Sequence, residues 1–277
     1  MNETKFNVND LIHCVFNKTN LGDRNRQILE SRFGLNSPQI LTLQELGDQY
    51  EITRERVRQI EESSLVKVKR EFKNIEEAKK LILFTQEFLN AIGGLKRHDF
   101  LVNEFYSLFK VSEDFSIFSN ELKFIYETFQ DPPYLFKETG FYYNFWYVEK
   151  ITYKKMFLIH KEMVKRLKKV EHFSEVLFEV IRPYKITESV AVNYLSVSKK
   201  IGVGPFGDLG LSHWEEINPR TVRAKTYLIL KKADQPLHFT EIADRIKAHP
   251  PTVHNELIKN EKFKLVSRGT YTLATKK

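Results

Sequence analysis

The chain has 277 residues with 44 Lys and Arg against 36 Asp and Glu, a net charge of +8 and a pI near 9.3. This length suits two average domains or several small ones, and the basic balance favours an acidic partner such as nucleic acid. The single cysteine, Cys14, excludes a disulfide framework and a cysteine-based zinc site. No long apolar run or signal-like N-terminus appears, so we expect a soluble, cytoplasmic protein without a membrane partner.

The first predicted helix is DRNRQILESRFGL, residues 23–35. Ile28, Leu29 and Phe33 fall at helical spacing and form an inward-facing stripe. Gly34 suits a left-handed C-cap, so the helix is expected to end there.

A second short helix is predicted over LTLQELGDQY, residues 41–50. Thr42 is its expected N-cap, and Glu45, three residues later, completes a capping box. Gly47 is small enough for two helices to approach closely. The apolar stripe consists of Leu43, Leu46 and Tyr50.

The third predicted helix begins in ITRERVRQIE, residues 52–61, with Thr53 as its N-cap. At 100° per residue its apolar positions fall on one stripe: Val57, Ile60, Ser64 and Val68, with Leu65 at the edge. The opposite side carries long polar side chains: Arg54, Glu55, Arg58, Gln59 and Glu62, with Arg56 on a flank.

Two short helices, a tight turn and a polar-faced second helix predict a helix-turn-helix. In such motifs the N-terminal residues of the second helix contact base edges in the major groove. Arg54 suits guanine, Gln59 suits adenine, and Glu55 can accept a hydrogen bond from the cytosine amino group. An ordinary solvated helix surface is the alternative interpretation of the same residues.

The segments RFGL, LTLQELG, ITRERVRQIE and SSLVKVKR, between about residues 21 and 72, resemble region 4 of the sigma-70 family of bacterial transcription initiation factors. The resemblance implies contact with the −35 promoter element of double-stranded DNA and with the β flap of RNA polymerase, in the bacterial cytoplasm at the nucleoid. It implies base contacts by Arg54, Glu55 and Gln59, and backbone contacts by Arg56 and Arg58. Thr42 and Thr53 complete the predicted DNA-binding set in this region.

Beyond residue 75 the chain shows a recurring unit of helices followed by two strand-like runs around a turn, the order of a winged helix. We therefore predict a mainly α fold, with an N-terminal helix-turn-helix and tandem winged-helix-like units. The expected domains are residues 1–75, 76–150, 151–217 and 218–277. Such small units bury little surface alone, so the last two are expected to pack together near Trp214 and Ile217.

The last unit has a resemblance of its own. LILKKADQPLHFTEIADRI and FKLVSRGTYTLA, within about residues 220–275, resemble the HARE-type winged helix shared with the delta subunit of bacterial RNA polymerase. By that resemblance PTVHNELIKN would be the recognition-equivalent helix, presenting His254, Asn255 and Lys259 to DNA. A merely solvated position for His254 is an equally open alternative.

Enzyme chemistry finds no support in the sequence, so we expect no enzyme, cofactor, metal or small-molecule substrate. GVGPFGDLG, residues 202–210, lacks the Lys-Ser or Lys-Thr of a phosphate loop and is interpreted as a wing turn. His249 and His254 do not share a helix face as metal ligands would. FYYNFWY, residues 141–147, is interpreted as a half-buried hairpin rather than a base-stacking platform, and KEMVKRLKK, residues 161–169, as a solvated helix surface.

The sequence thus predicts a sequence-specific DNA-binding transcription factor that acts with bacterial RNA polymerase. Two alternatives remain open. One is a polymerase-associated scaffold whose winged units bind protein. The other is the DNA-binding arm of a restriction or nuclease system.

Overall fold

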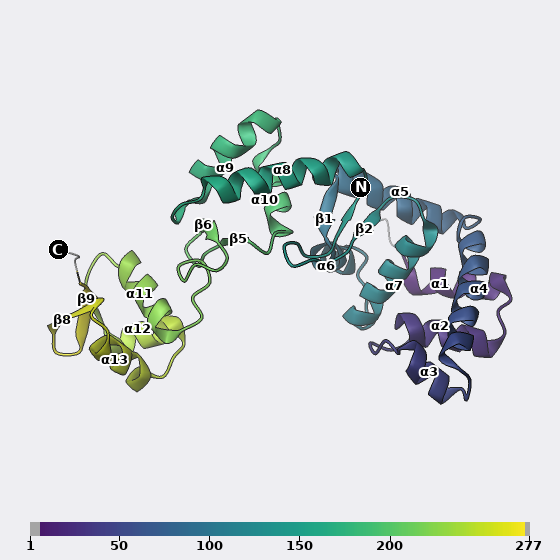
Figure 1. The fold of residues 1–277 in the computed structure, drawn as a ribbon, viewed down its shortest axis with the longest axis horizontal. Coiled ribbons are helices and arrows are strands. Elements are labelled where there is room, and N and C mark those ends of the chain that lie inside the picture. Colours follow the sequence, from purple (N-terminus) through teal and green to yellow (C-terminus); the bar gives the residue numbers. More distant parts are fainter. Residues whose placement is uncertain (1–5, 275–277) are drawn as a thin grey trace. The chain divides into compact units, whose positions relative to one another are not determined.

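The computed structural model describes residues 6–274, which form two compact units (Figure 1). The first comprises the described residues up to Ile159 together with Tyr184–Ser198, and the second comprises His160–Pro183 with the described residues from Lys199 onward. Within this part of the chain there are 13 α-helices and three small antiparallel sheets, so the predicted mainly α fold is confirmed. No helix within residues 6–274 is long and apolar enough to cross a membrane.

The first compact unit begins with four helices, of which the last three were expected from the sequence. They are α1 (Val8–Thr19), α2 (Asp23–Phe33), α3 (Leu43–Gln49) and α4 (Arg54–Phe72). The predicted caps are confirmed. Gly34 has a φ of 65° and its N–H donates to the Glu30 carbonyl. Thr42 and Glu45 form the reciprocal capping box on α3, and the Thr53 hydroxyl accepts from the N–H of Arg56 at 3.1 Å on α4.

The predicted apolar stripe of α4 is buried, as its helical spacing required. Val57 and Ile60 pack in a small cluster with Ile28 of α2 and Leu46 of α3. The turn between α3 and α4 leaves no room for a side chain at Gly47. A Cβ at this position would lie 2.8 Å from the Ile52 carbonyl oxygen, which is closer than such contacts normally come. A glycine at this position therefore lets the two helices of the motif approach each other.

Three winged-helix-like units follow, each with the order helix, strand, helix, helix, strand, strand. In every sheet the first strand pairs with the third and the third with the second, all antiparallel. The first unit of this kind contains α5 (Glu76–Ala91), β1 (Leu95–Arg97), α6 (His98–Leu108), α7 (Phe115–Phe129), β2 (Tyr134–Phe136) and β3 (Phe145–Tyr147).

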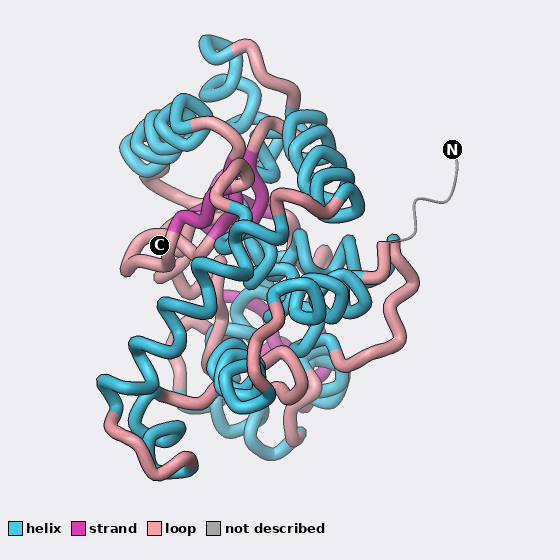
Figure 2. The backbone as a smooth tube through the Cα atoms, turned by 90° about the vertical axis from the view of Figure 1, so that its right-hand side faces the viewer, coloured by secondary structure: helices cyan, strands magenta, loops and turns pink. Residues whose placement is uncertain are grey.

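The second contains α8 (Lys150–Arg166), β4 (Glu171–His172), α9 (Phe173–Ile181), α10 (Glu188–Ser196), β5 (Ile201–Val203) and β6 (Asp208–Leu211), with a short 3-10 turn, η1 (Arg182–Tyr184), after α9. The third contains α11 (Val222–Lys232), β7 (Leu237–His238), α12 (Phe239–Ile246), α13 (Pro250–Lys259), β8 (Phe263–Ser267) and β9 (Thr270–Leu273). All of these strands have five residues or fewer, and Figure 2 shows them as short segments beside the helices.

The first strand of each winged unit was not expected from the sequence. These strands have only two or three residues, too few to show an alternation of apolar and polar positions. A histidine at the strand–helix junction recurs in all three units, at His98, His172 and His238. The segments HFSEV and HFTEI at the latter two are an internal repeat that marks the junction.

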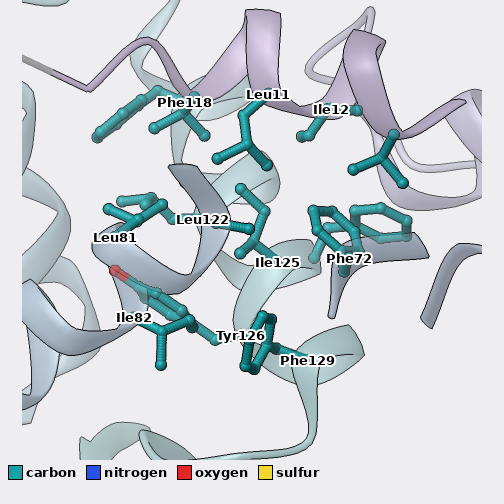
Figure 3. Close-up of a cluster of buried hydrophobic side chains, with 14 of the residues drawn as sticks. Leu11, Ile12, Phe72, Leu81, Ile82, Phe118, Leu122, Ile125, Tyr126 and Phe129 are labelled. Atoms are coloured by element: carbon teal, nitrogen blue, oxygen red, sulfur yellow. The ribbon is translucent and has the colours of Figure 1, made fainter. Parts of the chain in front are cut away.

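One hydrophobic core joins the N-terminal helices to the first winged unit (Figure 3). It runs without interruption across residue 75, where the sequence predicted a domain boundary, because Phe72, Ile75 and Ala78 all belong to it. The Phe124 ring of α7 lies 4.9 Å from Phe33 and 6.1 Å from Phe72 between ring centroids. The helix-turn-helix therefore folds against α7.

In the second compact unit the predicted wing turn is present between β5 and β6. The N–H of Gly204 donates to the Asp208 carbonyl at 2.7 Å and closes the turn. Ile217 is buried against this hairpin, since a Cβ on Gly202 or Gly210 would lie within 2.8 Å of its side chain. Trp214 lines a cleft of about 570 Å³ together with Tyr227 and Leu228 of α11.

The shared core of the first unit generates a prediction about stability. Phe124→Ala removes a buried ring that contacts three other phenylalanines, so we expect a loss of roughly 3–5 kcal/mol in the free energy of unfolding. Hydrogen exchange should show reduced protection in α2 and α4, although Phe124 lies far from them in sequence. Leu83→Ala, at a 56% exposed position of α5, is the matched control and should change stability by less than about 0.5 kcal/mol. Unchanged protection of α2 and α4 in Phe124→Ala would show that these helices fold independently.

A buried carboxyl in the same unit makes stability depend on pH. Glu121 of α7 is fully buried; its Oε1 accepts a hydrogen bond from Asn9 Nδ2 at 2.7 Å, and its Oε2 has no hydrogen-bond partner among residues 6–274. Burial, helped by the neighbouring Glu113 carboxylate, raises the pKa of Glu121 to about 8. The side chain is therefore protonated in the folded protein at neutral pH.

We expect the free energy of unfolding to fall as pH rises from about 4.5 to about 8, because the unfolded chain releases this proton at the ordinary pKa and the folded chain retains it. Glu121→Gln should remove that component of the slope, with an upper limit of roughly 5 kcal/mol over the window. Urea unfolding at several pH values measures it, with Glu127→Gln, an exposed position of the same helix, as control. Equal slopes in the wild type and Glu121→Gln would contradict the assignment.

Candidate nucleic-acid interface

The residues of α4 that were predicted to contact DNA, at bases or at the backbone, are exposed. Arg54, Glu55, Arg56, Arg58 and Gln59 are all exposed, while Val57 and Ile60 between them are buried. The structure thus exposes all five predicted DNA-contacting residues of this helix in its N-terminal turns, with Arg56 on the flank. We call these five residues the α4 polar face.

Charges on the α4 polar face are paired in an ordered way. The Arg58 guanidinium donates to both carboxylate oxygens of Glu55, at 2.7 and 2.9 Å, and also to Glu62. The hydrogen bonds from Arg58 lower the pKa of Glu55, so this carboxylate remains charged and is only an acceptor. Arg58 is therefore paired with one carboxylate on the preceding turn of the helix, Glu55, and with one on the following turn, Glu62.

Two further arginines of the α4 polar face are differently placed. Arg56 donates to Gln59 Oε1 at 3.2 Å, so these two side chains are held next to each other. Arg54 makes no ion pair with any residue in the described part of the chain. Its guanidinium, beside the N-terminus of α4, therefore keeps its donors available for an external acceptor such as guanine or phosphate.

The two threonines of the predicted set act locally as helix caps. Thr42 and Thr53 are exposed, and each hydroxyl accepts a hydrogen bond from a backbone N–H of the first turn that follows it. Capping places the first turns of α3 and α4 at the surface in a fixed conformation. The Thr42 and Thr53 side chains thus stabilise the first turns of the two helices of the motif. A direct contact of either threonine with DNA stays a prediction.

Two arginines that the sequence interpretation did not single out fix the orientation of α4. Arg32 of α2 pairs with Glu61 of α4 at 3.1 Å and donates to the Leu41 carbonyl at 3.3 Å. Arg24 donates to the carbonyl of Tyr50, in the turn, at 2.8 Å and lies over its ring. No spacing rule marks these partners, because they come together only when α2 packs against the turn and α4.

The predicted C-terminal set is not brought together in the same way. His254 of α13 is half-buried, with its ring 4.5 Å from that of Phe239 and 6.0 Å from that of Tyr271 between centroids. Asn255 and Lys259 are exposed on another side of the helix. His254 therefore packs against its own winged unit. A contact between His254 and DNA stays a prediction, and the half-buried position of this side chain does not favour it.

The aromatic segment 141–147 packs mostly inward, as expected for a hairpin. Phe145 and Trp146 are buried, and the Trp146 indole donates to His98 Nδ1 at 2.9 Å. Burial is the main cause that lowers the pKa of His98 to about 4, so its imidazole is neutral and free to accept this bond. Phe141 remains 55% exposed at the tip.

Comparison with known proteins bears on one part of the chain. Residues 19–70 match the family described as Sigma-70, region 4. The chain is similar to RNA polymerase sigma factor sigB of Arabidopsis thaliana, with 44% identity over 54 residues, which is 20% of this chain and 9% of that protein. It is also similar to RNA polymerase sigma factor SigA of Lactococcus lactis subsp. cremoris, with 43% identity over 49 residues, which is 18% of this chain and 14% of that protein.

The chain therefore matches less than a sixth of the length of these relatives. No solved structure matches the chain. The HARE-type resemblance of the last winged unit stays a prediction. The segment that carries α2, α3 and α4 is thus a helix-turn-helix whose sequence matches sigma-70 region 4.

Proposed function

We propose that this protein is a sequence-specific DNA-binding transcription factor that recognises −35-like promoter DNA and acts in initiation with bacterial RNA polymerase. The observation that carries the proposal is the coincidence of two facts in residues 19–70. This segment matches sigma-70 region 4, and its α4 exposes the polar residues that such a domain needs while burying the opposite stripe.

In the proposed complex the N-terminal half of α4 enters the major groove. Arg54 and Gln59 hydrogen-bond to base edges, and Glu55 accepts from a cytosine amino group. Arg56 and Arg58 contact the phosphates beside them. Glu55 and Glu62 use three of the five N–H donors of Arg58 in the free protein, so a phosphate would share this guanidinium with the two carboxylates, and Arg58 is a modest contributor to affinity.

The proposed protein partner is RNA polymerase, with the β flap as the contact of region 4. Support comes from the two relatives, which are named as RNA polymerase sigma factors. Affinity capture of the native full-length protein tests this part separately from DNA binding. Recovery of polymerase subunits is the expected result, and recovery of a nuclease or methylase in their place would favour the restriction-system alternative.

Base recognition by α4 leads to a specific prediction. Arg54→Ala should weaken binding to a preferred site by roughly 1–3 kcal/mol and relax the choice of base at one position, because it removes a base contact. Arg58→Ala should weaken binding to all sequences about equally, because a phosphate contact carries no base information. Site selection from random duplexes, followed by affinity measurement, compares the two variants with the wild type.

The full-length chain is the proper sample for this experiment, since the core of the helix-turn-helix extends into α7. Neither substitution should change the unfolding midpoint, because both side chains are exposed. Ile60→Ala is the folding control, and the cavity it leaves should lower stability. If the wild type selects no site, and Arg54→Ala behaves as Arg58→Ala does, then the α4 polar face is only a charged helix surface.

A further inference from the structure

We infer that the C-terminal winged unit is a second binding site for duplex DNA, one that contacts phosphates without selecting sequence, whereas the two middle winged units do not bind DNA through their third helices. The third helix of each unit, α7, α10 or α13, is the one in the position of a recognition helix. The inference rests on the proposed function only in its choice of DNA as the acidic partner.

The positive charge of the chain is concentrated in this last unit. Residues 218–277 contain 13 Lys and Arg against 5 Asp and Glu, a net charge of +8. The preceding 217 residues contain 31 of each sign and are neutral overall. The basic balance of the whole protein therefore belongs to its C-terminal unit, although the sequence-reading helix-turn-helix lies at the other end.

The third helix of the first winged unit is not available to a partner. From Ile117 to Phe129, α7 exposes only Glu127, and its other residues are buried or half-buried. They pack against α1, α2 and α4 in the shared core. This helix holds the helix-turn-helix in place instead of facing solvent.

The third helix of the second winged unit is also occupied within the chain. Asn193 of α10 donates to the carbonyls of Ile92 and Leu95, at 3.0 and 2.6 Å, and the Tyr194 hydroxyl donates to the Gly93 carbonyl at 2.7 Å. These partners belong to the segment that leads into β1. In addition, α10 contains no lysine or arginine to meet a phosphate.

The third helix of the last winged unit has a different environment. Along α13 the side chains of Thr252, Asn255 and Lys259 form an exposed stripe, and Ile258 beside them is 61% exposed. Val253 and Leu257 supply the buried side. Among the three winged units, this is the one whose recognition-equivalent helix presents a continuous surface to solvent in the described part of the chain.

Three cations of this winged unit have no acidic partner in the described part of the chain. Lys259, Lys264 and Arg268, on α13, β8 and the wing turn, are exposed and make no ion pair within residues 6–274. By contrast, Lys231 and Lys232 of α11 are paired with Glu216 and Asp208. Unpaired, exposed cations on one helix and the adjacent wing suit the regularly spaced phosphates of a duplex.

The distribution of these residues favours phosphate contact over base recognition. In helix-turn-helix proteins the N-terminal residues of the recognition helix contact base edges. In α13 those positions hold Pro250, Pro251 and Thr252, none of which can form the forked hydrogen bonds of Arg, Asn or Gln. The cations lie at the C-terminal end of α13 and in the wing, so they contribute affinity but little sequence information.

Duplex DNA is the partner that the rest of the chain brings near. Once α4 is bound, the tethered C-terminal unit experiences a high effective concentration of the same duplex, so even weak phosphate contacts add to total affinity. An acidic protein surface or RNA could also attract the same cations. Those two partners are therefore separate arms of the test.

The test uses the full-length protein carrying Lys259→Ala, Lys264→Ala and Arg268→Ala together. Its matched control carries Lys80→Ala, Lys137→Ala and Lys154→Ala, which remove the same charge from exposed positions outside the C-terminal unit. Fluorescence anisotropy with a random-sequence DNA duplex is measured from about 50 to 200 mM salt. Circular dichroism and thermal unfolding confirm that both proteins remain folded.

For the C-terminal variant we expect affinity to fall by at least about tenfold at the lowest salt. Its log–log salt slope should become shallower by roughly 2 to 3, close to 0.9 for each phosphate that the variant no longer neutralises. The control should bind less than about twofold more weakly and keep its slope, because its lysines lie away from the DNA. Equal weakening in the two variants would reduce the effect to net charge and overturn the inference, as would an unchanged slope in the C-terminal variant.

Competition by double-stranded RNA or an acidic polypeptide completes the design. If either competitor releases the labelled duplex from the wild type at a lower concentration than unlabelled random DNA does, and the C-terminal variant loses this difference, the assignment of DNA is overturned. Failure of the proposed function would look different, because the wild type would then show no preferred sequence while the C-terminal variant would still bind random DNA more weakly. Both readouts come from the same set of proteins.

Discussion

The aromatic contacts of α7 are the interaction on which the first compact unit depends. Phe124 lies against Phe16, Phe33 and Phe72, so one ring joins α1, α2 and α4 to the first winged unit. A helix-turn-helix of three short helices buries little surface on its own and is marginally stable. Packing it onto α7 extends its core, and α4 thereby gains a rigid base while its polar side remains in solvent.

A second constraint acts at the turn of the motif. Gly47 allows the Ile52 carbonyl to approach closely, and Arg24 and Arg32 tie the turn and α4 to α2 through backbone and carboxylate oxygens. These contacts fix the direction in which the first turn of α4 projects. The ion pair between Glu55 and Arg58 orders part of the surface that would meet DNA in the proposed complex.

The three winged units share one topology and differ in what their third helices contact. In the first, the helix supports the helix-turn-helix, and in the second it binds residues 92–95, which lead into β1 and begin it. The third leaves its helix exposed among unpaired cations. One repeated fold thus places the same element in three different surroundings, and fold alone does not decide function.

The local features of this protein could be predicted from its amino-acid sequence. Helical periodicity, the caps at Thr42 and Thr53, the C-cap glycine Gly34 and the polar side of α4 are all encoded within a few residues of one another, and their spacing predicted them. The winged order of helices and hairpins followed from the same local patterns. The region 4 match, too, rests on one continuous segment.

Which surfaces remain exposed depends on how the elements pack in three dimensions. The continuous core across residue 75, the burial of α7, the docking of α10 and the inward packing of His254 join residues far apart in the chain. An apolar stripe shows that a helix has a buried side, but not which element covers it or whether its other side is covered as well. That choice depends on long-range packing, because the free energy of burying apolar area does not depend on sequence separation.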